Sequence, residues 1–107
     1  MKLDSIIDTI KSIETRDSAR EYQDSILSAL KMKGFECSRE FKVESRGTPD
    51  GYRGFVDIVV EADGERCGIE IDRKSPRKKS IHKLLNGPFD ERIIVLREGE
   101  RYGVYSF

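Results

Sequence analysis

The segment FVDIVVEADGERCGIEID, residues 55–72, decides the fold. It is rich in Val and Ile, and Asp63-Gly64 near its middle is a dipeptide that favours two-residue β-turns. The segment therefore predicts a β-hairpin whose register follows from the turn. With Asp63 and Gly64 alone in the loop, the expected cross-strand pairs are Ala62–Glu65, Glu61–Arg66, Val60–Cys67, Val59–Gly68, Ile58–Ile69 and Asp57–Glu70.

Alternation along the two strands sorts the hairpin side chains onto two faces. The expected core face carries Val56, Ile58, Val60, Cys67, Ile69 and Ile71. The expected polar face carries Asp57, Glu61, Arg66, Glu70 and Asp72. Glu61 opposite Arg66 is an ordinary ion pair, whereas Asp57 opposite Glu70 is unfavourable unless a cation lies between them.

Asp72 adds a third carboxylate to this face, two residues beyond Glu70. Several carboxylate oxygens in one place are what a hard divalent cation prefers, and Mg²⁺ is the natural candidate. The alternative is that each acid is an ordinary solvated surface residue. The opposition of Asp57 and Glu70 favours the metal site over that alternative.

The rest of the chain predicts a mixed α/β domain with one central sheet flanked by helices. Helices are expected over residues 1–14, from Ser18 to Gly34 and from Ser75-Pro76 to Gly87. Further strands are expected over residues 37–43, 92–97 and 102–107. Residues 1–107 thus form one domain, with an amphipathic N-terminal helix in 1–15 and a core in 16–107. The first helix is expected either to cover the sheet or to form a dimer surface.

Composition narrows the class of protein. The 107 residues are 36% hydrophobic and 37% charged, which is typical of a small soluble domain. No apolar run is long enough for a bilayer span or a signal peptide, so we expect a cytoplasmic protein without membrane contact. The two cysteines are too few for a disulfide framework.

Positive charge is concentrated in one segment although the formal net charge is zero. Such a cluster favours contacts with the phosphate backbone of a nucleic acid, which depend on salt and not on base sequence. The expected nucleic-acid contacts are Arg73, Lys74, Arg77, Lys78, Lys79, His82 and Lys83, with Arg53 from the preceding loop.

The order of these elements and acids resembles the PD-(D/E)xK nuclease superfamily, which includes restriction-endonuclease-like and Holliday-junction-resolvase-like enzymes. The resemblance covers Ser18 to Phe107 and implies a restriction-endonuclease-like core. It implies that Asp57 in GFVDIVV and Glu70 in GIEID are the two metal-binding acids, with the main-chain carbonyl of Ile71 as a further ligand. It also implies Mg²⁺ as the cofactor, with Mn²⁺ substituting, and no small-molecule cofactor. The literal Pro49-Asp50 dipeptide lies in a turn and is given no catalytic role.

The chain departs from the family at the third motif position, where Asp72 stands in place of the usual Lys. Some members carry an acid there, and others take the basic group from elsewhere. The substitutes in reach are Lys74, on the same face if the strand continues, and Lys78 or Lys79 from the next helix. Asp72 would complete the metal shell, bind a second ion or orient the attacking water.

The resemblance also implies a further catalytic polar side chain from the first core helix, and Gln23 fits this role because it lies in the middle of the apolar stripe of that helix. The alternative is a glutamine at the core edge, bonded to backbone.

Together these features predict a Mg²⁺-dependent endonuclease that hydrolyses DNA phosphodiester bonds. Branched or junction DNA is one candidate substrate, and a homodimer is one candidate assembly, as in other minimal members of the superfamily. The small size would suit a phage enzyme. The main alternative is a non-catalytic nucleic-acid-binding module with a nuclease-like fold. A third alternative is a partner-binding protein with a basic docking helix, for which no divalent-ion dependence is expected.

Overall fold

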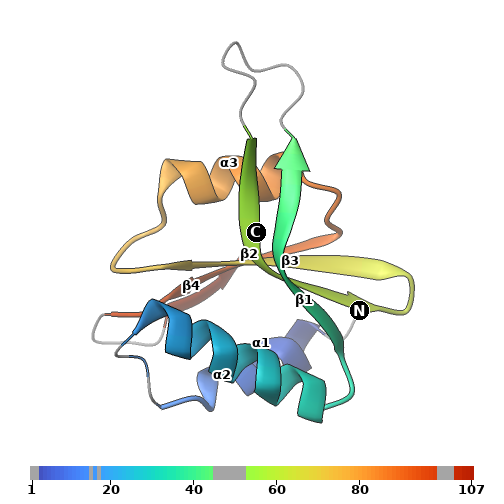
Figure 1. Cartoon of the computed structure of the whole chain (residues 1–107), viewed down its shortest axis with the longest axis vertical. Coiled ribbons are helices and arrows are strands. Elements are labelled where there is room, and N and C mark those ends of the chain that lie inside the picture. The colour runs from blue at the N-terminus through green and yellow to red at the C-terminus, as the bar shows by residue number, and fades with distance from the viewer. Residues whose placement is uncertain (1–2, 15, 17, 45–52, 99–102) are drawn as a thin grey trace.

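The structure is a computed structural model that describes residues 3–14, 16, 18–44, 53–98 and 103–107. Within these ranges the helices are α1 (Leu3–Lys11), α2 (Ala19–Met32) and α3 (Lys78–Asn86). The strands are β1 (Glu36–Glu44), β2 (Arg53–Ala62), β3 (Glu65–Asp72), β4 (Glu91–Leu96) and β5 (Gly103–Ser106). The predicted order of helices and strands is confirmed, and α3 lies on one side of the sheet with α1 and α2 on the other (Figure 1).

The strands form one mixed sheet in the order β1-β2-β3-β4-β5. Neighbouring strands are antiparallel except β3 and β4, which are parallel and are connected through α3. The predicted hairpin is present: Asp63 and Gly64 form the turn with φ of 54° and 78°. The β2–β3 ladder runs from Ala62–Glu65 to Ile58–Ile69 in the predicted register. Asp57 and Glu70, both described, do not continue this ladder.

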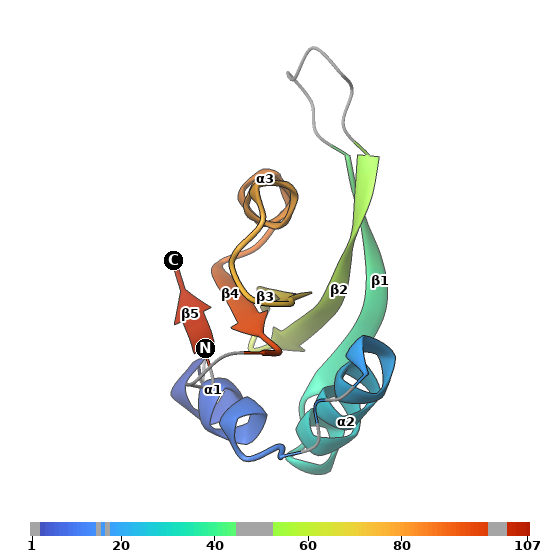
Figure 2. The same cartoon turned by 90° about the vertical axis from the view of Figure 1, so that its left-hand side faces the viewer.

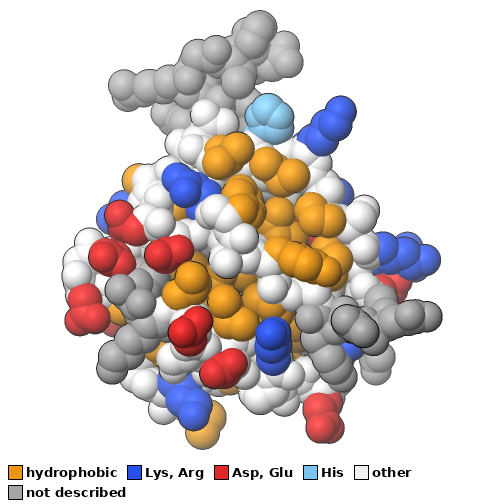
Figure 3. Space-filling view, turned by 180° about the vertical axis from the view of Figure 1, so that it is seen from behind, with side chains coloured by type: hydrophobic (Ala, Val, Ile, Leu, Met, Phe, Trp, Pro, Cys, Tyr) orange, Lys and Arg blue, Asp and Glu red, His pale blue; other side chains and the backbone are white. Residues whose placement is uncertain are grey.

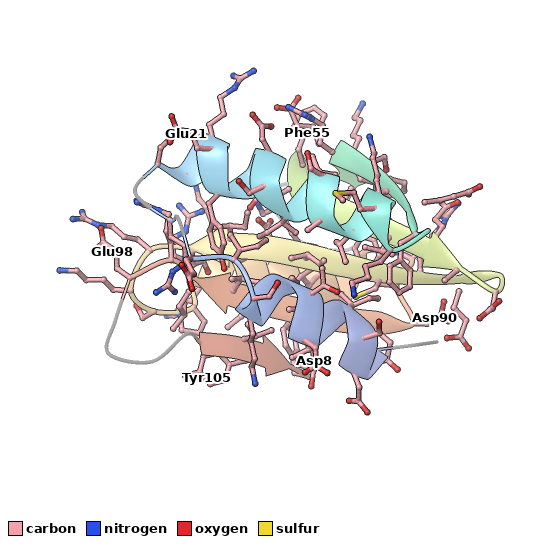
Figure 4. All side chains as sticks on the ribbon, turned by 90° about the horizontal axis from the view of Figure 1, so that it is seen from below. Asp8, Glu21, Phe55, Asp90, Glu98 and Tyr105 are labelled. Atoms are coloured by element: carbon pink, nitrogen blue, oxygen red, sulfur yellow. The ribbon has the colours of Figure 1, made fainter. Side chains whose placement is uncertain are left out.

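The face of the sheet that α1 and α2 cover holds the larger apolar core. Ile6 and Ile10 of α1 are fully buried there, against the sheet and α2. The apolar stripe of α1 therefore covers the sheet, which was one of its two expected roles. Figure 4 shows α1 and α2 lying alongside each other across this face. The remaining buried members of the cluster are Tyr22, Ile26, Leu27, Leu30, Ile58, Val60, Cys67, Ile69, Ile93 and Val95.

The opposite face, which was predicted to carry the polar side chains of the hairpin, is covered by α3. A second apolar cluster fills this layer; its buried members are Val43, Val56, Val59, Leu84, Phe89, Ile94 and Leu96. Gly68 allows α3 to approach β3 closely, because a Cβ atom at this position would lie 2.9 Å from Leu84 Cδ2 and from the Phe89 ring. The close approach of α3 removes the neighbouring β3 side chains from water.

The β1–β2 pair bends where Asp57 lies. Glu40 has a positive φ of 55°, and the described ladder passes from Arg39–Ile58 to Phe41–Val56 without pairing Glu40 with Asp57. Val56 consequently packs in the cluster under α3 although Ile58 packs under α2, which corrects the prediction that both lie on one face. Figure 2 shows the long curved pair passing from α2 to the level of α3.

Helix α3 begins later than predicted. Its N-cap is Arg77, so Ser75-Pro76 precedes the helix. Its buried residues are Ser80 and Leu84, whereas Leu85 is 55% exposed. Apolar side chains also reach the surface on the side seen in Figure 3. None of the helices in the described ranges is long and apolar enough to cross a membrane.

Candidate active site

Asp57 is held at the bend of β2 by two other elements. Its carboxylate Oδ2 accepts a hydrogen bond of 2.8 Å from the backbone N–H of Ile71 in β3. Its backbone carbonyl accepts a hydrogen bond of 2.8 Å from Nε2 of Gln23 in α2. The structure thus brings the predicted residues Asp57, Gln23 and Ile71 together, and Gln23 contacts the backbone of Asp57, as the alternative for this residue anticipated.

Glu70 lies in β3 under α3 and is 0% exposed. Lys83 of α3 forms an ion pair with Glu70 Oε1, and its ammonium also donates to the backbone carbonyl of Phe55 at 3.0 Å. Among the described residues, Glu70 Oε2 is buried without a hydrogen-bond donor. A buried carboxylate oxygen without a donor is costly, so this atom calls for a proton or a cation.

The electrostatics of Glu70 lead to the same conclusion. Burial, together with the hydrogen bond and the charge of the neighbouring Asp57 carboxylate, raises the pKa of Glu70 to about 8. Lys83 acts in the opposite direction and offsets only part of this effect. The raised pKa therefore favours the protonated form of Glu70 next to the Asp57 carboxylate.

Asp72 also lies under α3 and is 2% exposed. Its carboxylate accepts hydrogen bonds from Arg77 N at 2.9 Å, Arg77 Nε at 3.0 Å and Ser80 Oγ at 2.7 Å. These contacts satisfy a backbone N–H at the start of α3, which the side chain of Arg77 does not cap. Asp72 thus fixes the connection between β3 and α3.

The predicted patch of three acids resolves into a pair and a separate carboxylate. In the part of the chain that the structure describes, no three His, Cys, Asp or Glu side chains gather so that they could hold a metal ion. Asp57 and Glu70 lie next to each other, whereas Asp72 is engaged by Arg77 and Ser80. A metal-binding role for Asp72 stays a prediction, as does the carbonyl of Ile71 as a ligand.

The predicted basic cluster is divided by the structure. Lys83 points inward to Glu70, and Arg77 contacts Asp72. Arg73 pairs with Glu98 at 3.0 Å. Arg73 and Arg77 are nevertheless exposed, as are Lys74, Lys78, Lys79 and His82. The side chain of Arg53 lies outside the described residues, as do Pro49 and Asp50.

Sequence reasoning missed two residues of this region. Lys83 was predicted as a nucleic-acid contact and not as the partner of Glu70, and Ser80 was not singled out. The helical spacing carried a usable signal, because Lys83 and Leu84 follow Ser80 by three and four positions and so lie on the same side of α3 as Ser80.

A pocket of about 260 Å³ opens on Asp57 between α2 and the β1–β2 pair. Its lining mixes two cations with acids and apolar groups: Ala19, Arg20, Gln23, Arg39, Glu40, Asp57 and Ile71. Asp57 and Ile71 are thus reached from the side of α2, whereas α3 covers Glu70.

Comparison with known proteins gives no relative from which a role could be assigned: no protein-family model matches the chain, and no curated protein is significantly similar to it.

Proposed function

We propose that this protein is a divalent-metal-dependent nuclease that hydrolyses phosphodiester bonds in DNA. The observation that carries the proposal is the placement of the adjacent Asp57 and Glu70 carboxyl groups beside Lys83. Two carboxylates and one ammonium, with one of the carboxylates, Asp57, lining a small pocket, are the groups that metal-assisted phosphodiester hydrolysis needs.

The architecture supports the same proposal. The run α2-β1-β2-β3-α3-β4 has an antiparallel β1–β2–β3 part, followed by a parallel β4 reached through α3. This is compatible with the restriction-endonuclease-like core that the resemblance to PD-(D/E)xK nucleases implies. A fold alone does not define an activity, so the proposal depends on the site.

The donor set fits a hard divalent cation. Asp57 and Glu70 would hold it, since both offer carboxylate oxygens and Glu70 Oε2 is buried without a donor among the described residues. The Ile71 carbonyl is a further proposed ligand. Bound there, Mg²⁺ or Mn²⁺ would supply Lewis acidity and lower the pKa of a water molecule.

The protein groups around the pair have separate roles in this proposal. The backbone N–H of Ile71 orients the carboxylate of Asp57, and Gln23 fixes the backbone of the same residue. The ammonium of Lys83 stabilises the negative charge that develops on the phosphate, the role expected of the motif lysine. Lys83 thus replaces Lys74, Lys78 and Lys79 as the proposed catalytic lysine, and Asp72 is proposed to be structural.

The test is cleavage of supercoiled, linear and four-way-junction DNA with Mg²⁺, Mn²⁺ or EDTA. Asp57→Asn and Glu70→Gln are each expected to reduce the cleavage rate by about 100-fold or more. The matched control is Glu61→Gln, because Glu61 is a carboxylate of the same hairpin that pairs with Arg66 at 3.0 Å on the surface. The proposal would be overturned if the wild type still cleaved DNA in EDTA. It would also be overturned if Glu61→Gln reduced cleavage as much as Asp57→Asn and Glu70→Gln do.

One observation favours a second candidate, a non-catalytic nucleic-acid-binding module. The Lys83–Glu70 ion pair already provides Glu70 with a positive partner, so the arrangement is also compatible with a purely structural pair. This alternative predicts DNA binding without cleavage, unchanged by Glu70→Gln. A cytoplasmic location, a homodimer and branched DNA as substrate stay predictions.

A further inference from the structure

The pocket beside Asp57 carries two arginines that the charge pattern of the sequence did not single out. Arg20 comes from the first turn of α2 and Arg39 from β1, and both line the pocket together with Gln23 and Asp57. Helix α2 and strand β1 therefore each contribute one arginine to the lining of the pocket from which Asp57 is reached.

Arg39 is positioned by a contact across the pocket wall. Its Nη1 atom lies 3.0 Å from Asp24 Oδ1 of α2, and the two side chains are 47% and 48% exposed. A guanidinium has five N–H donors, and one carboxylate engages at most two of them. Arg39 is thus held in place while it keeps donors for a second anion.

The size and chemistry of the pocket favour a phosphate group as the second anion. A volume of about 260 Å³ is below the range of roughly 300–1,000 Å³ that is usual for small-molecule sites. Arginine forks match the geometry of phosphate oxygens. A backbone phosphate, whose sugar and base lie outside the protein, fits this pocket better than an enclosed ligand does.

A substrate can reach Asp57 of the Asp57–Glu70 pair from the α2 side of the sheet, the side on which Arg20 and Arg39 line the pocket. Helix α3 covers Glu70, and its basic residues Lys78, Lys79 and His82 are exposed, whereas Lys83 is directed inward. The pocket, in contrast, reaches Asp57 from the side of α2, the helix in the upper part of Figure 4. A phosphodiester that enters this pocket therefore lies next to Arg20 and Arg39 as well as Asp57.

We propose that Arg20 and Arg39 bind the DNA phosphate next to the scissile one, so that the DNA strand crosses the α2–β1 side of the site. This inference rests on the proposed function, because it assumes a nucleic-acid substrate at Asp57. It assigns substrate positioning to two residues outside the basic segment of residues 73–83.

The experiment measures binding of fluorescein-labelled duplex and four-way-junction DNA by fluorescence anisotropy, with EDTA so that metal-dependent cleavage does not interfere. Arg20→Gln and Arg39→Gln are each expected to weaken binding about tenfold. Each is also expected to lower the slope of log affinity against log salt concentration by about one, as is typical of a lost phosphate contact.

Two matched controls separate a phosphate contact from a structural effect. Arg66→Gln removes an arginine whose 3.0 Å ion pair with Glu61 resembles that of Arg39 with Asp24. Asp24→Asn removes the carboxylate charge of the Arg39–Asp24 pair but keeps the guanidinium and a side-chain oxygen that can still accept a hydrogen bond from it. Both controls are expected to keep the wild-type salt slope, and Asp24→Asn to bind DNA at least as tightly as the wild type.

The possible outcomes distinguish this inference from the function on which it rests. If the wild type binds DNA and the Arg20 and Arg39 variants bind it equally well with the same salt slope, the inference is overturned and the nuclease proposal stands. If Asp24→Asn weakens binding as much as Arg39→Gln, the role of Arg39 is structural and the inference is overturned too. If the wild type binds neither the duplex nor the four-way junction, the proposed function itself is overturned.

Discussion

Glu70 and Asp72 are two acids on the same strand, on the same face and under the same helix, yet their surroundings differ. Asp72 accepts hydrogen bonds from the backbone and side chain of Arg77 and from Ser80. Glu70 is 0% exposed, pairs with Lys83 and lies against the carboxyl group of Asp57. The difference teaches that burial alone does not set the electrostatics of an acid: hydrogen bonds compensate the charge of Asp72, whereas burial and the neighbouring Asp57 raise the pKa of Glu70.

We expect the Asp72 and Glu70 carboxylates to have different roles. Asp72 stabilises the start of α3, so a change there is expected to affect folding. Glu70 is kept with a pKa raised to about 8 by burial and by Asp57, an arrangement that costs stability at neutral pH. A change there is expected to affect activity and the pH dependence of folding.

The largest expected effect on stability comes from Asp72→Lys, the replacement that would restore the literal motif lysine. It places an ammonium in a site that is 2% exposed and faces Arg77, so we expect the free energy of unfolding to fall by about 4 kcal/mol. Urea denaturation followed by circular dichroism measures it. Asp8→Lys on the exposed side of α1 makes the same change of charge and is expected to change stability by less than about 0.5 kcal/mol.

Cys67 provides an independent readout of the same variant. It is fully buried in β3, and burial raises the pKa of its thiol to about 12, so it should resist thiol reagents in the folded protein. Asp72→Lys is expected to make Cys67 reactive through increased unfolding, and Asp8→Lys is not. An Asp72→Lys protein as stable and as unreactive as the wild type would show that the contacts of Asp72 contribute little.

Glu70 should leave a signature in the pH dependence of stability. Its pKa is raised in the folded protein to about 8 from an ordinary value of 4.5, so folding takes up a proton between these pH values. The contribution of Glu70 is fully present below about pH 4.5 and is lost as the pH rises to about 8. The unfolding free energy of the metal-free wild type should therefore fall over this range relative to that of Glu70→Gln.

The comparison is made by denaturant titration in EDTA at a series of pH values. Mg²⁺ is expected to flatten the wild-type curve, since a cation held by the two carboxylates replaces the proton. Parallel curves for the wild type and Glu70→Gln from pH 4.5 to 8 would contradict the account of Glu70.

A smaller effect is expected at the hydroxyl that supports Asp72. Ser80→Ala removes a buried hydrogen bond of 2.7 Å but leaves both contacts of Arg77, so we expect a loss of about 1 kcal/mol. Ser28→Ala, on the exposed side of α2, serves as the control with no measurable change. A loss at Ser80 as large as that of Asp72→Lys would mean that Arg77 adds nothing to the connection.

The hairpin was predictable in detail because its signals are local. The Asp63-Gly64 turn fixes the register, and alternation places Glu70 and Asp72 on one face. The bend at Asp57 was not predictable, because it arises from Glu40 on another strand and from the Gln23 contact. Val56 was assigned to the wrong face for the same reason.

The two acids of the candidate site were predictable from the sequence, but the lysine that pairs with Glu70 was not. Spacing along the strand pointed to Lys74, whereas the ammonium that reaches Glu70 comes from Lys83, thirteen positions after Glu70 in the sequence. The long-range packing of α3 on Gly68 decides this, and no local pattern reports it. The division of the basic segment into inward and outward side chains has the same origin.

The most direct test of the central claim compares two lysines in one cleavage assay. Lys83→Met keeps the length of the side chain, and the fold should survive because Glu70 can take up a proton. With Mg²⁺ and supercoiled DNA, we predict that Lys83→Met loses cleavage by about 100-fold while Lys74→Met stays within about threefold of the wild type. Full cleavage by Lys83→Met together with loss of cleavage in Lys74→Met would contradict the account.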